Sequence, residues 1–388
     1  MIEGWELKTL DIISENLDNK RIPITKNKRE EGNIPYYGAS GIVDYVKDYI
    51  FDEDLLLVSE DGANLIARTY PIAFSINGKN WVNNHAHVLK FENMDTQKYI
   101  EFYLNFIKLD DYLSGMAQPK LNKRMLNSIL IPIPPLKEQK QIVTTLDKAF
   151  KQIDQAKANL EKNLNSAKEL FQSKLNEVFS QRGEGWEENR LKEITTKIGS
   201  GSTPRGGQAS YKESGISLIR SMNVHDDGFR EKKLAFIDDE QALKLKNVTL
   251  EKEDVLLNIT GASVARCCIV PDNFLPARVN QHVSIIRLKE NILHPSYLHY
   301  CLTAQENKNK LLNIGRQGAT REAITKVQIE NFIISYPKDM NKQLEVLEAL
   351  HVIKEKSNLL QTHYQQKLNN LEELKKSILQ KAFKGELV

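Results

Sequence analysis

The sequence predicts an α+β protein in which two related globular domains are separated by two long antiparallel helices. Three observations support this fold class: an internal repeat of about 200 residues, two long segments that lack proline and glycine, and a narrow apolar stripe along each segment. The repeat is far longer than a solenoid unit, so it indicates a duplicated domain pair related by a pseudo-twofold axis. The expected divisions are a globular domain at 1–135, a helix at 136–181, a second globular domain at 182–338 and a second helix at 339–388.

The two halves of the chain match each other in the same order along the sequence. One match could arise by chance, but an ordered set indicates a duplication. In both halves a short apolar run behind a turn leads into a polar loop with glycine, which is typical of a buried strand. The matched segments are Gly4-Trp5-Glu6 with Gly185-Trp186-Glu187, Asp54-Leu55-Leu56-Leu57 with Asp254-Val255-Leu256-Leu257, 59–64 with 258–263, Val82-Asn83-Asn84-His85 with Val279-Asn280-Gln281-His282, and 173–179 with 377–383.

The two segments without proline or glycine are predicted to form long helices. Apolar residues recur there at three- and four-residue steps, from Ile142 to Leu175 and from Leu344 to Ala382, which is the pattern of a coiled coil. Such a helix is roughly 65 Å long and must bury its stripe. The other copy is the natural partner, and the pseudo-twofold relation makes the pairing antiparallel. The alternative is a homodimeric coiled coil between two chains.

Three motifs carry a family resemblance. Gly-Trp-Glu opens each half, Ile131-Pro132-Ile133-Pro134-Pro135-Leu136-Lys137-Glu138-Gln139 leads into the first helix, and Ser200-Gly201-Ser202-Thr203-Pro204 begins the second globular domain. In these motifs, and over essentially its whole length, the chain resembles the specificity subunit of type I restriction-modification enzymes. Two departures leave the domain edges defined to within a few residues: the second boundary reads Ile334-Ser335-Tyr336-Pro337-Lys338, and the first half has no Gly-Thr-Pro turn.

The resemblance implies a partner set and a division of labour. Each globular domain would be a target-recognition domain that reads one half-site of a bipartite, asymmetric sequence in double-stranded DNA. The helices would fix the gap between half-sites and dock two methyltransferase subunits, and two restriction subunits would complete the complex. S-adenosylmethionine would belong to the methyltransferase, and ATP and Mg²⁺ to the restriction subunit, so this chain would bind no cofactor or metal. Half-sites on one face of B-DNA lie about 34–36 Å apart per helical turn, a spacing that a rigid helical rod can fix and a flexible linker cannot.

Polar and basic side chains in loops are the candidates for DNA contact, because they suit phosphates and base edges. In the first domain the candidates are Lys28, Arg29, Tyr37, Ser40, Asn64, Asn83, Asn84, Lys120, Lys123 and Arg124. In the second domain they are Ser202, Thr203, Arg205, Arg220, Asn223, Asn280, Gln281, Arg316, Thr320 and Arg321.

Position in the repeat ranks these candidates. Asn83 matches Asn280, and Lys123 and Arg124 match Arg321, which strengthens all of them. Each candidate also has the simpler interpretation of a solvated loop residue. Glu30 and Glu31 weaken the patch formed by Lys28 and Arg29, and we expect His85 and His282 to be structural hydrogen bonders.

The sequence contains no catalytic motif that fits. Its one Pro-Pro pair, in Ile133-Pro134-Pro135-Leu136, lacks the polar and aromatic neighbours of an adenine methyltransferase loop, and 199–207 is rich in glycine but has no P-loop lysine. We therefore expect a non-catalytic subunit. A coiled-coil scaffold that binds proteins, or a fused enzyme with recognition domains, are the alternatives. A net charge of +3 leaves DNA binding open, the three cysteines suit a reducing cytoplasm, and we expect neither a signal peptide nor a membrane span.

Overall fold

The computed structural model describes residues 3–115, 118–181, 183–316 and 322–387. The chain forms two compact units, Met1–Glu161 with Gln365–Val388 and Lys162–Tyr364. Each unit therefore contains one globular head and part of each long helix. We call the described residues up to 135 head 1, and those from 183 to 338 head 2. Among the described residues, no helix is both long enough and apolar enough to cross a membrane.

Head 1 is built on two four-stranded sheets and one two-stranded sheet, whose strand orders are β2-β9-β6-β7, β4-β3-β8-β5 and β1-β10. Its strands are β1 (Glu6–Thr9), β2 (Glu15–Asn16), β3 (Glu31–Gly38), β4 (Gly41–Val46), β5 (Phe51–Asp52), β6 (Leu55–Ser59), β7 (Ala73–Ile76), β8 (Lys79–Val82), β9 (Ala86–Lys90) and β10 (Leu130–Ile133). Its α-helices are α1 (Leu10–Ile13), α2 (Asn64–Ala67), α3 (Met94–Phe106) and α4 (Lys123–Asn127).

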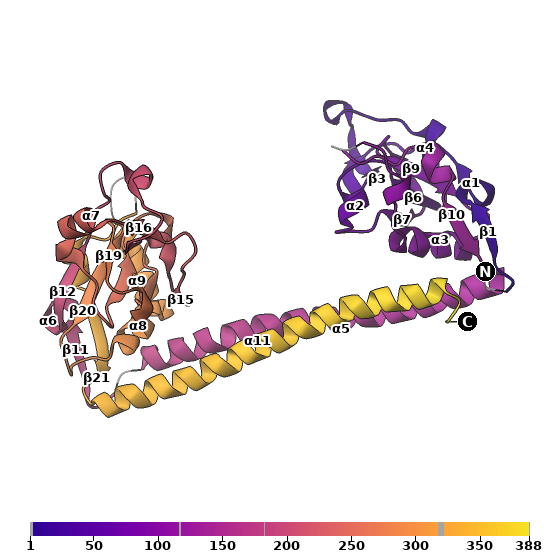
Figure 1. Cartoon of the computed structure of the whole chain (residues 1–388). Coiled ribbons are helices and arrows are strands. Elements are labelled where there is room, and N and C mark those ends of the chain that lie inside the picture. Colours follow the sequence, from indigo (N-terminus) through magenta and orange to yellow (C-terminus); the bar gives the residue numbers. More distant parts are fainter. Residues whose placement is uncertain (1–2, 116–117, 182, 317–321, 388) are drawn as a thin grey trace. The chain divides into compact units, whose positions relative to one another are not determined.

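Head 2 repeats this plan with additions, and its sheets have the orders β12-β20-β17-β18, β16-β13-β19, β11-β21 and β14-β15. Its strands are β11 (Trp186–Arg190), β12 (Thr195–Ser200), β13 (Ile216–Ile219), β14 (Val224–His225), β15 (Gly228–Phe229), β16 (Ala235–Ile237), β17 (Val255–Asn258), β18 (Cys267–Ile269), β19 (Ala277–Val279), β20 (Val283–Leu288) and β21 (Ile333–Pro337). Its α-helices are α6 (Leu191–Ile194), α7 (Asp239–Lys244), α8 (Pro295–Thr303), α9 (Gln305–Arg316) and α10 (Lys326–Glu330). Figure 1 shows both heads in the colours of the sequence.

The duplication inferred from the sequence is visible in the strand ladders. β6 lies between β9 and β7 in head 1, as β17 lies between β20 and β18 in head 2, and β3 pairs in parallel with β8 as β13 does with β19. The match of Leu55-Leu56-Leu57 with Val255-Leu256-Leu257 is wrong by one residue. Leu56 pairs with Leu89 and Val255 with Ile286, so Leu56 corresponds to Val255. A slip of one residue would turn every side chain to the opposite face of the sheet.

Two long helices, α5 (Leu136–Ser180) and α11 (Met340–Phe383), carry the apolar stripes. They lie side by side and antiparallel in each unit (Figure 1). In unit 1, Lys157 Nζ lies 2.8 Å from Glu372 Oε1, and Lys375 Nζ lies 3.7 Å from Asp154 Oδ1. In unit 2, Ser357 Oγ donates to the Ala167 carbonyl oxygen at 2.6 Å, and the Lys354 ammonium lies 5.9 Å from the centroid of Phe171. Within each unit, residue numbers therefore rise on one helix as they fall on the other. The predicted antiparallel pairing of long helices within one chain is therefore confirmed in each unit.

A buried glutamine ties the start of each long helix to its head. The Gln139 amide donates to the Pro134 carbonyl oxygen at 2.8 Å and accepts from Thr96 Oγ1 at 2.8 Å. The Gln343 amide likewise donates to Pro337 at 2.8 Å and accepts from the His294 N–H at 2.9 Å. The second boundary thus keeps the anchoring glutamine although its proline motif has changed. These bonds satisfy buried polar groups where strand passes into helix.

Aromatic side chains complete the joint between heads and helices. Phe383 at the end of α11 packs edge-on against Tyr99 of head 1, with ring centroids 5.5 Å apart. Phe179 at the end of α5 packs against Tyr297 of head 2 at 5.0 Å, and the two pairs occupy matched positions. Each head therefore shares one apolar core with the beginning of one long helix and the end of the other.

Candidate nucleic-acid interface

Four polar loops meet at one end of head 1. The Glu60 N–H donates to the His85 carbonyl oxygen at 2.9 Å, and the Asn83 N–H donates to Tyr37 at 3.0 Å. The loop at 114–122 joins them through Leu121, whose N–H donates to the Glu60 carbonyl oxygen at 2.8 Å. These loops follow β3, β6 and β8 and precede α4. We call them the loop cluster of head 1, comprising the described residues of 38–41, 59–64, 83–85 and 114–122.

Head 2 holds its loops together with the same backbone bonds. The Ile259 N–H donates to the His282 carbonyl oxygen at 3.0 Å, the Asn280 N–H to Ile219 at 3.1 Å, and the Ile324 N–H to Ile259 at 2.8 Å. Gly201 also donates to the Asn280 carbonyl oxygen at 3.1 Å, which adds the turn after β12. The loop cluster of head 2 comprises the described residues of 201–206, 220–223, 258–263, 280–282 and 322–325. One framework therefore presents different side chains in the two heads.

Six candidates lie exposed on these clusters, and one of them is Arg205 in the turn after β12. In head 1, Asn84 is at the tip of the β8–β9 turn, Ser40 follows β3 and bonds the Tyr70 hydroxyl at 3.1 Å, and Lys120 reaches Glu60 at 3.2 Å. In head 2, Gln281 occupies the matched tip of the β19–β20 turn. Ser202 is likewise exposed in the turn after β12.

Four candidate asparagines are buried and act within the loops. Asn83 and Asn280 each accept the backbone N–H two residues later, from His85 at 2.8 Å and from His282 at 3.0 Å. Asn64 binds the 69–70 turn, and Asn223 accepts from the Arg220 N–H at 3.1 Å. Burial keeps these amides from a base edge in this conformation. The matched pair that faces solvent is the next one along the chain, Asn84 with Gln281.

Other candidates are partly engaged inside head 2 or lie beside the cluster. Thr203 hydrogen-bonds Gln281, and the half-buried Arg220 stacks over Tyr211 at 5.2 Å while donating to the Lys233 carbonyl oxygen. Tyr37 of head 1 is half-buried against Phe74. Arg316 is exposed at the end of α9. Thr320 and Arg321 lie outside the described residues.

Lys28 and Arg29 lie away from the loop cluster. Arg29 donates to Asp44 at 2.9 Å and to the Ile24 carbonyl oxygen at 3.1 Å, beside the exposed Lys28. Both precede β3, whose eight residues span roughly 26 Å, whereas the loop cluster follows that strand.

The predicted match of Lys123 and Arg124 with Arg321 needs correction. Asn122 caps α4 as Thr325 caps α10, so the structural counterpart of Lys123 is Lys326, and that of Arg124 is Val327. Lys123 and Arg124 are exposed in the first turn of α4, next to the cluster.

A buried ionic network supports the loop cluster of head 1. The His87 ring lies between Asp18, whose Oδ2 is 2.6 Å from Nδ1, and the Leu121 carbonyl oxygen, which accepts from Nε2 at 2.7 Å. Both ring nitrogens thus face oxygen atoms. Arg21 extends the network to Glu60 at 2.6 Å and to the Ala86 carbonyl oxygen at 2.8 Å. The network ties β2, β6 and β9 to the 114–122 loop.

The charges of this network hold its carboxylates ionised. Burial acts to raise the pKa of Asp18, but the hydrogen bond and charge of His87, the Val88 N–H and Arg21 together lower it below the ordinary value. Burial also acts to raise the pKa of Glu60, but Arg21, His87 and Lys120 outweigh burial and lower this pKa below its ordinary value. None of the four central residues of this network was among the candidates predicted from the sequence: Asp18, Arg21, Glu60 and His87. Their spacing along the chain gives no periodic signal, although a histidine within an apolar strand was a visible exception to the pattern.

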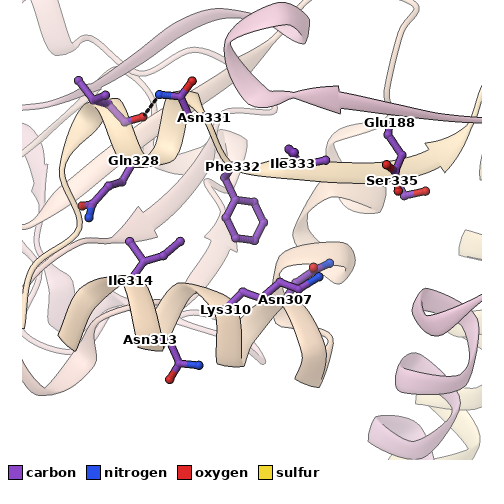
Figure 2. A pocket seen from close by; sticks show the side chains of 11 residues that line it. Glu188, Asn307, Lys310, Asn313, Ile314, Gln328, Asn331, Phe332, Ile333 and Ser335 are labelled. Atoms are coloured by element: carbon purple, nitrogen blue, oxygen red, sulfur yellow. Dashed lines mark hydrogen bonds between the residues drawn. The ribbon is translucent and has the colours of Figure 1, made fainter. Parts of the chain in front are cut away.

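A hollow in head 2 is lined by α9, α10 and the start of β21. Figure 2 shows Asn307, Lys310, Asn313 and Ile314 of α9 on one side, and Gln328, Asn331 and Phe332 on the other. The Phe332 ring points toward α9. Head 1 has no counterpart of α9 among its described residues, so the hollow is not part of the repeated framework. In the described parts of the chain, no group of three or more His, Cys, Asp or Glu side chains is placed to hold a metal ion.

The duplicated heads, their repeated loop frameworks and the antiparallel helices define a two-headed α+β protein with two related polar surfaces. The family model for the type I restriction modification DNA specificity domain matches residues 2–166 and again 183–370. The chain belongs to this family.

Individual relatives agree with the family assignment. A putative type I restriction enzyme specificity subunit of Haemophilus influenzae is 38% identical over 149 residues, which is 38% of each chain. The EcoBI specificity subunit of Escherichia coli is 26% identical over 71% of this chain and 62% of its own length. The MjaVIII specificity subunit of Methanocaldococcus jannaschii is 23% identical over 99% of this chain and 93% of its own. The match thus spans less than two thirds of the first two relatives.

Solved structures share the fold. A chain from a structure of a type I restriction-modification system superposes with a TM-score of 0.75 at 18% identity, over 98% of both chains. The HsdS subunit from Thermoanaerobacter tengcongensis superposes with a TM-score of 0.59 at 18% identity, over 99% of this chain and 98% of that one. The predicted α+β class with long paired helices is confirmed by these similarities.

Proposed function

We propose that this chain is the DNA sequence-specificity subunit of a type I restriction-modification complex, and that each head reads one half-site of a split, asymmetric target. The observation that carries this proposal is the loop cluster. The two heads repeat the same backbone bonds between strand ends, yet differ in the side chains they expose, such as Asn84 against Gln281. Two unlike readers on one framework suit two unlike half-sites.

The exposed side chains divide the work of recognition. Asn84 and Gln281 at the matched turn tips are the proposed base readers, because amides form paired hydrogen bonds with adenine in the major groove. Ser40, Ser202 and Thr203 add hydroxyl contacts. The cations Lys28, Lys120, Lys123, Arg124, Arg205, Arg220 and Arg316 would bind phosphates and fix the position of the head.

The two helices act as the spacer that sets the gap between the two half-sites. α5 and α11 contain 45 and 44 residues without a break, and near its start each has a buried glutamine anchored in its own head. A continuous helix fixes a length, whereas a flexible chain samples many. In functional terms we propose recognition domains at 1–135 and 182–338, with spacer helices at 136–181 and 339–388.

The chemistry would belong to partner subunits. We propose that the helices dock two methyltransferase subunits, which carry S-adenosylmethionine, and that two restriction subunits bring ATP and Mg²⁺. This chain itself would be non-catalytic, because its sequence contains neither the methyltransferase loop nor a P-loop lysine. It would work in the cytoplasm, where its DNA target lies.

Exchange of one head tests the proposal directly. Residues 1–135 are replaced by the corresponding segment of a relative with a different target, and the chain is expressed with its methyltransferase partner. Sequencing of methylated adenines should show one half-site changed, with the other half-site and the gap retained. A change in both half-sites, or methylation that ignores the exchange, would contradict the proposal.

A salt series separates the proposal from a protein-binding scaffold. Affinity of the assembled methyltransferase for duplex DNA should fall steeply as salt rises, because each phosphate contact releases counterions. The matched control is a complex in which Lys120, Lys123 and Arg124 are replaced by glutamine, which should show a shallower slope. Equal slopes would exclude these three cations as phosphate contacts.

A further inference from the structure

In each unit a phenylalanine of α5 lies against a lysine of α11. In unit 1 the Lys375 ammonium lies 4.7 Å from the centroid of the Phe150 ring. In unit 2 the Lys354 ammonium lies 5.9 Å from the centroid of Phe171. Both distances are within the range of cation–π attraction. At both places α5 provides the ring and α11 provides the charge.

Duplication alone would not produce this arrangement. Counted from the matched anchors Gln139 and Gln343, Phe150 corresponds to Lys354, and Lys375 corresponds to Phe171. The ring and the ammonium have therefore exchanged places between the two copies of the helix. As a result α5 carries both rings, and α11 carries both ammonium groups.

Other contacts between the helices show the same complementarity. Lys157 of α5 pairs with Glu372 of α11 at 2.8 Å, and the positions that correspond to this pair hold Gln361 and Lys168. Facing positions thus have lysine on α5 and an acceptor on α11 in both copies.

The size of the facing side chains also differs between the two units. The buried Ser357 hydroxyl bonds the Ala167 carbonyl oxygen at 2.6 Å, so two small residues meet there. The positions that correspond to this small pair hold two large residues, Leu371 and the buried Ile153.

We infer that the facing residues of α5 and α11, which we call the pairing code, favour pairing of these two helices with each other. The same residues disfavour pairing with the same helix of a second copy of the chain. In the observed register, α5 paired with another α5 would set Phe150 against Phe171 and Lys157 against Lys168. Two α11 helices would set Lys354 against Lys375. Facing like charges destabilise helix pairs, so the wrong pairing is penalised as well as the right one favoured.

The inference rests on the proposed function and sharpens it. Self-pairing of one helix would join two identical heads, which suits a palindromic target. Pairing of α5 with α11 always joins two unlike heads. The α5 surface is thus complementary to α11, and pairing of these two helices joins two unlike heads, which suits an asymmetric target.

Exchange of the residues at one end removes the code while preserving each contact within the chain. In the full chain, F171K with K354F retains a ring–ammonium pair in unit 2. It also makes self-pairing favourable, because Phe150 would then face the ammonium that F171K introduces in another copy. The matched control adds F150K with K375F, so that all four positions are exchanged. That control restores a code of the opposite sense, with both ammonium groups on α5.

A single cysteine reports self-pairing. The observed register places Leu160 of α5 opposite itself in an α5 pair, so L160C can form a disulfide between two chains only when their α5 helices meet. The native Cys267, Cys268 and Cys301 are buried, and a chain without L160C measures their background. Each L160C chain is refolded from denaturant at high concentration, oxidised and separated on a non-reducing gel.

With wild-type residues at the code positions, the cross-linked dimer should stay at background. The double exchange should raise it several-fold, and the fourfold exchange should return it to background. Equal cross-linking in wild type and the double exchange, or in the double and fourfold exchanges, would overturn the inference. The circular dichroism melting curve of each chain shows whether it has folded.

A second variant covers the case in which the double exchange does not fold. K168E changes one exposed residue, and it turns the repulsion between Lys157 and Lys168 of a self-paired α5 into attraction. It should therefore also raise the L160C dimer, whereas K168Q should raise it less. Equal dimer from K168E and wild type would overturn the inference. No DNA enters either assay, so failure here is distinct from failure of the proposed function.

Discussion

The two heads share one framework but place their buried ion pairs at opposite ends of the same strand. In head 1 the network of Asp18, His87, Arg21 and Glu60 lies where β6 ends, under the loop cluster. At the matched ladder position, head 2 has Ser200 opposite Ser284. Head 2 instead has a buried pair at the start of β17, where both oxygens of Asp254 accept from Arg287 at 2.8 Å.

The strand pairing is therefore common to both heads, whereas the buried charged groups stabilise a different end of each head. The head 1 loops depend on groups that titrate, whereas in head 2 the counterpart of Glu60 is the buried Ile259. Just before β6, head 1 has the exposed Asp54. Just before β17, head 2 has the fully buried Asp254. Removal of a buried charge is therefore expected to destabilise the loop end of head 1 and the start of β17 in head 2.

The largest effect is expected at the buried pair of head 2. Asp254→Ala removes both bonds from Asp254 to the Arg287 guanidinium, which keeps its contacts with Glu251 and the Thr249 carbonyl oxygen, and should lower the free energy of unfolding by about 3 kcal/mol. Asp54→Ala, at the same end of the strand in head 1, should change it by no more than about 0.5 kcal/mol because Asp54 is exposed. Urea unfolding, with hydrogen exchange of β17 and β20 amides to locate the loss, measures both. Similar losses for the two variants would refute the comparison.

The next effect is expected in the loop base of head 1. Asp18→Asn keeps the shape of the side chain but loses charge-assisted bonds, and should destabilise this region by about 1–3 kcal/mol at neutral pH. The matched Ser200→Ala in head 2 should cost much less, because Ser200 is exposed. Hydrogen exchange of the amides in each loop cluster measures both losses, and equal losses would contradict the expected difference between the heads.

The same network predicts a pH dependence of the loop cluster of head 1. The pKa values of Asp18 and Glu60 are lowered in the folded chain. Their stabilisation is therefore present above the ordinary carboxyl pKa and is lost as pH falls through the lowered values. Protection of the Val88 and Leu121 amides should fall on acidification in wild type, and fall less in Asp18→Asn. Equal pH dependence in both chains would show that the network does not control the loops.

Much of the fold could be predicted because its signals are local or repeated. The helix stripes recur every three or four residues, and the matched segments keep their order, so α5, α11 and the duplication follow from the sequence. The one-residue slip at Leu56 had a physical cause. β6 is apolar on both faces, since it is buried on both sides, and such a run carries no alternation to fix its register.

The candidate site was predicted less well because exposure is a tertiary property. The sequence contains Asn83 and Asn84 side by side, and only the folded turn shows that the first is buried and the second is exposed. The network of His87 could not be read either. Its partners Asp18 and Leu121 lie 69 and 34 residues away along the chain, and only the sheet brings them together.

The matched turn tips give a smaller effect that separates the heads in function. Asn84→Ala should lose about 1–3 kcal/mol of discrimination at one base pair of one half-site, and Gln281→Ala the same at the other half-site. Each variant serves as the control for the other. Competition binding by the assembled methyltransferase, with single base pairs changed in each half-site, measures the loss. Loss at both half-sites from one variant would contradict the division of reading between heads.

The smallest effect is expected in the spacer, at the ion pair of Lys157 with Glu372 in unit 1. Lys157 and Glu372 are both about half exposed, so their pairing should contribute only about 0.5 kcal/mol. Glu372→Gln gives unit 1 a lysine of α5 that faces a glutamine of α11, the same combination as Lys168 and Gln361 in unit 2. A double-mutant cycle with Lys157→Ala, measured by thermal unfolding, should give a small coupling that disappears at high salt because exposed charges are screened. A coupling above about 1 kcal/mol that persists in salt would mean that this pair stabilises the spacer, in which case the ends of α5 and α11 would differ in strength as well as in charge.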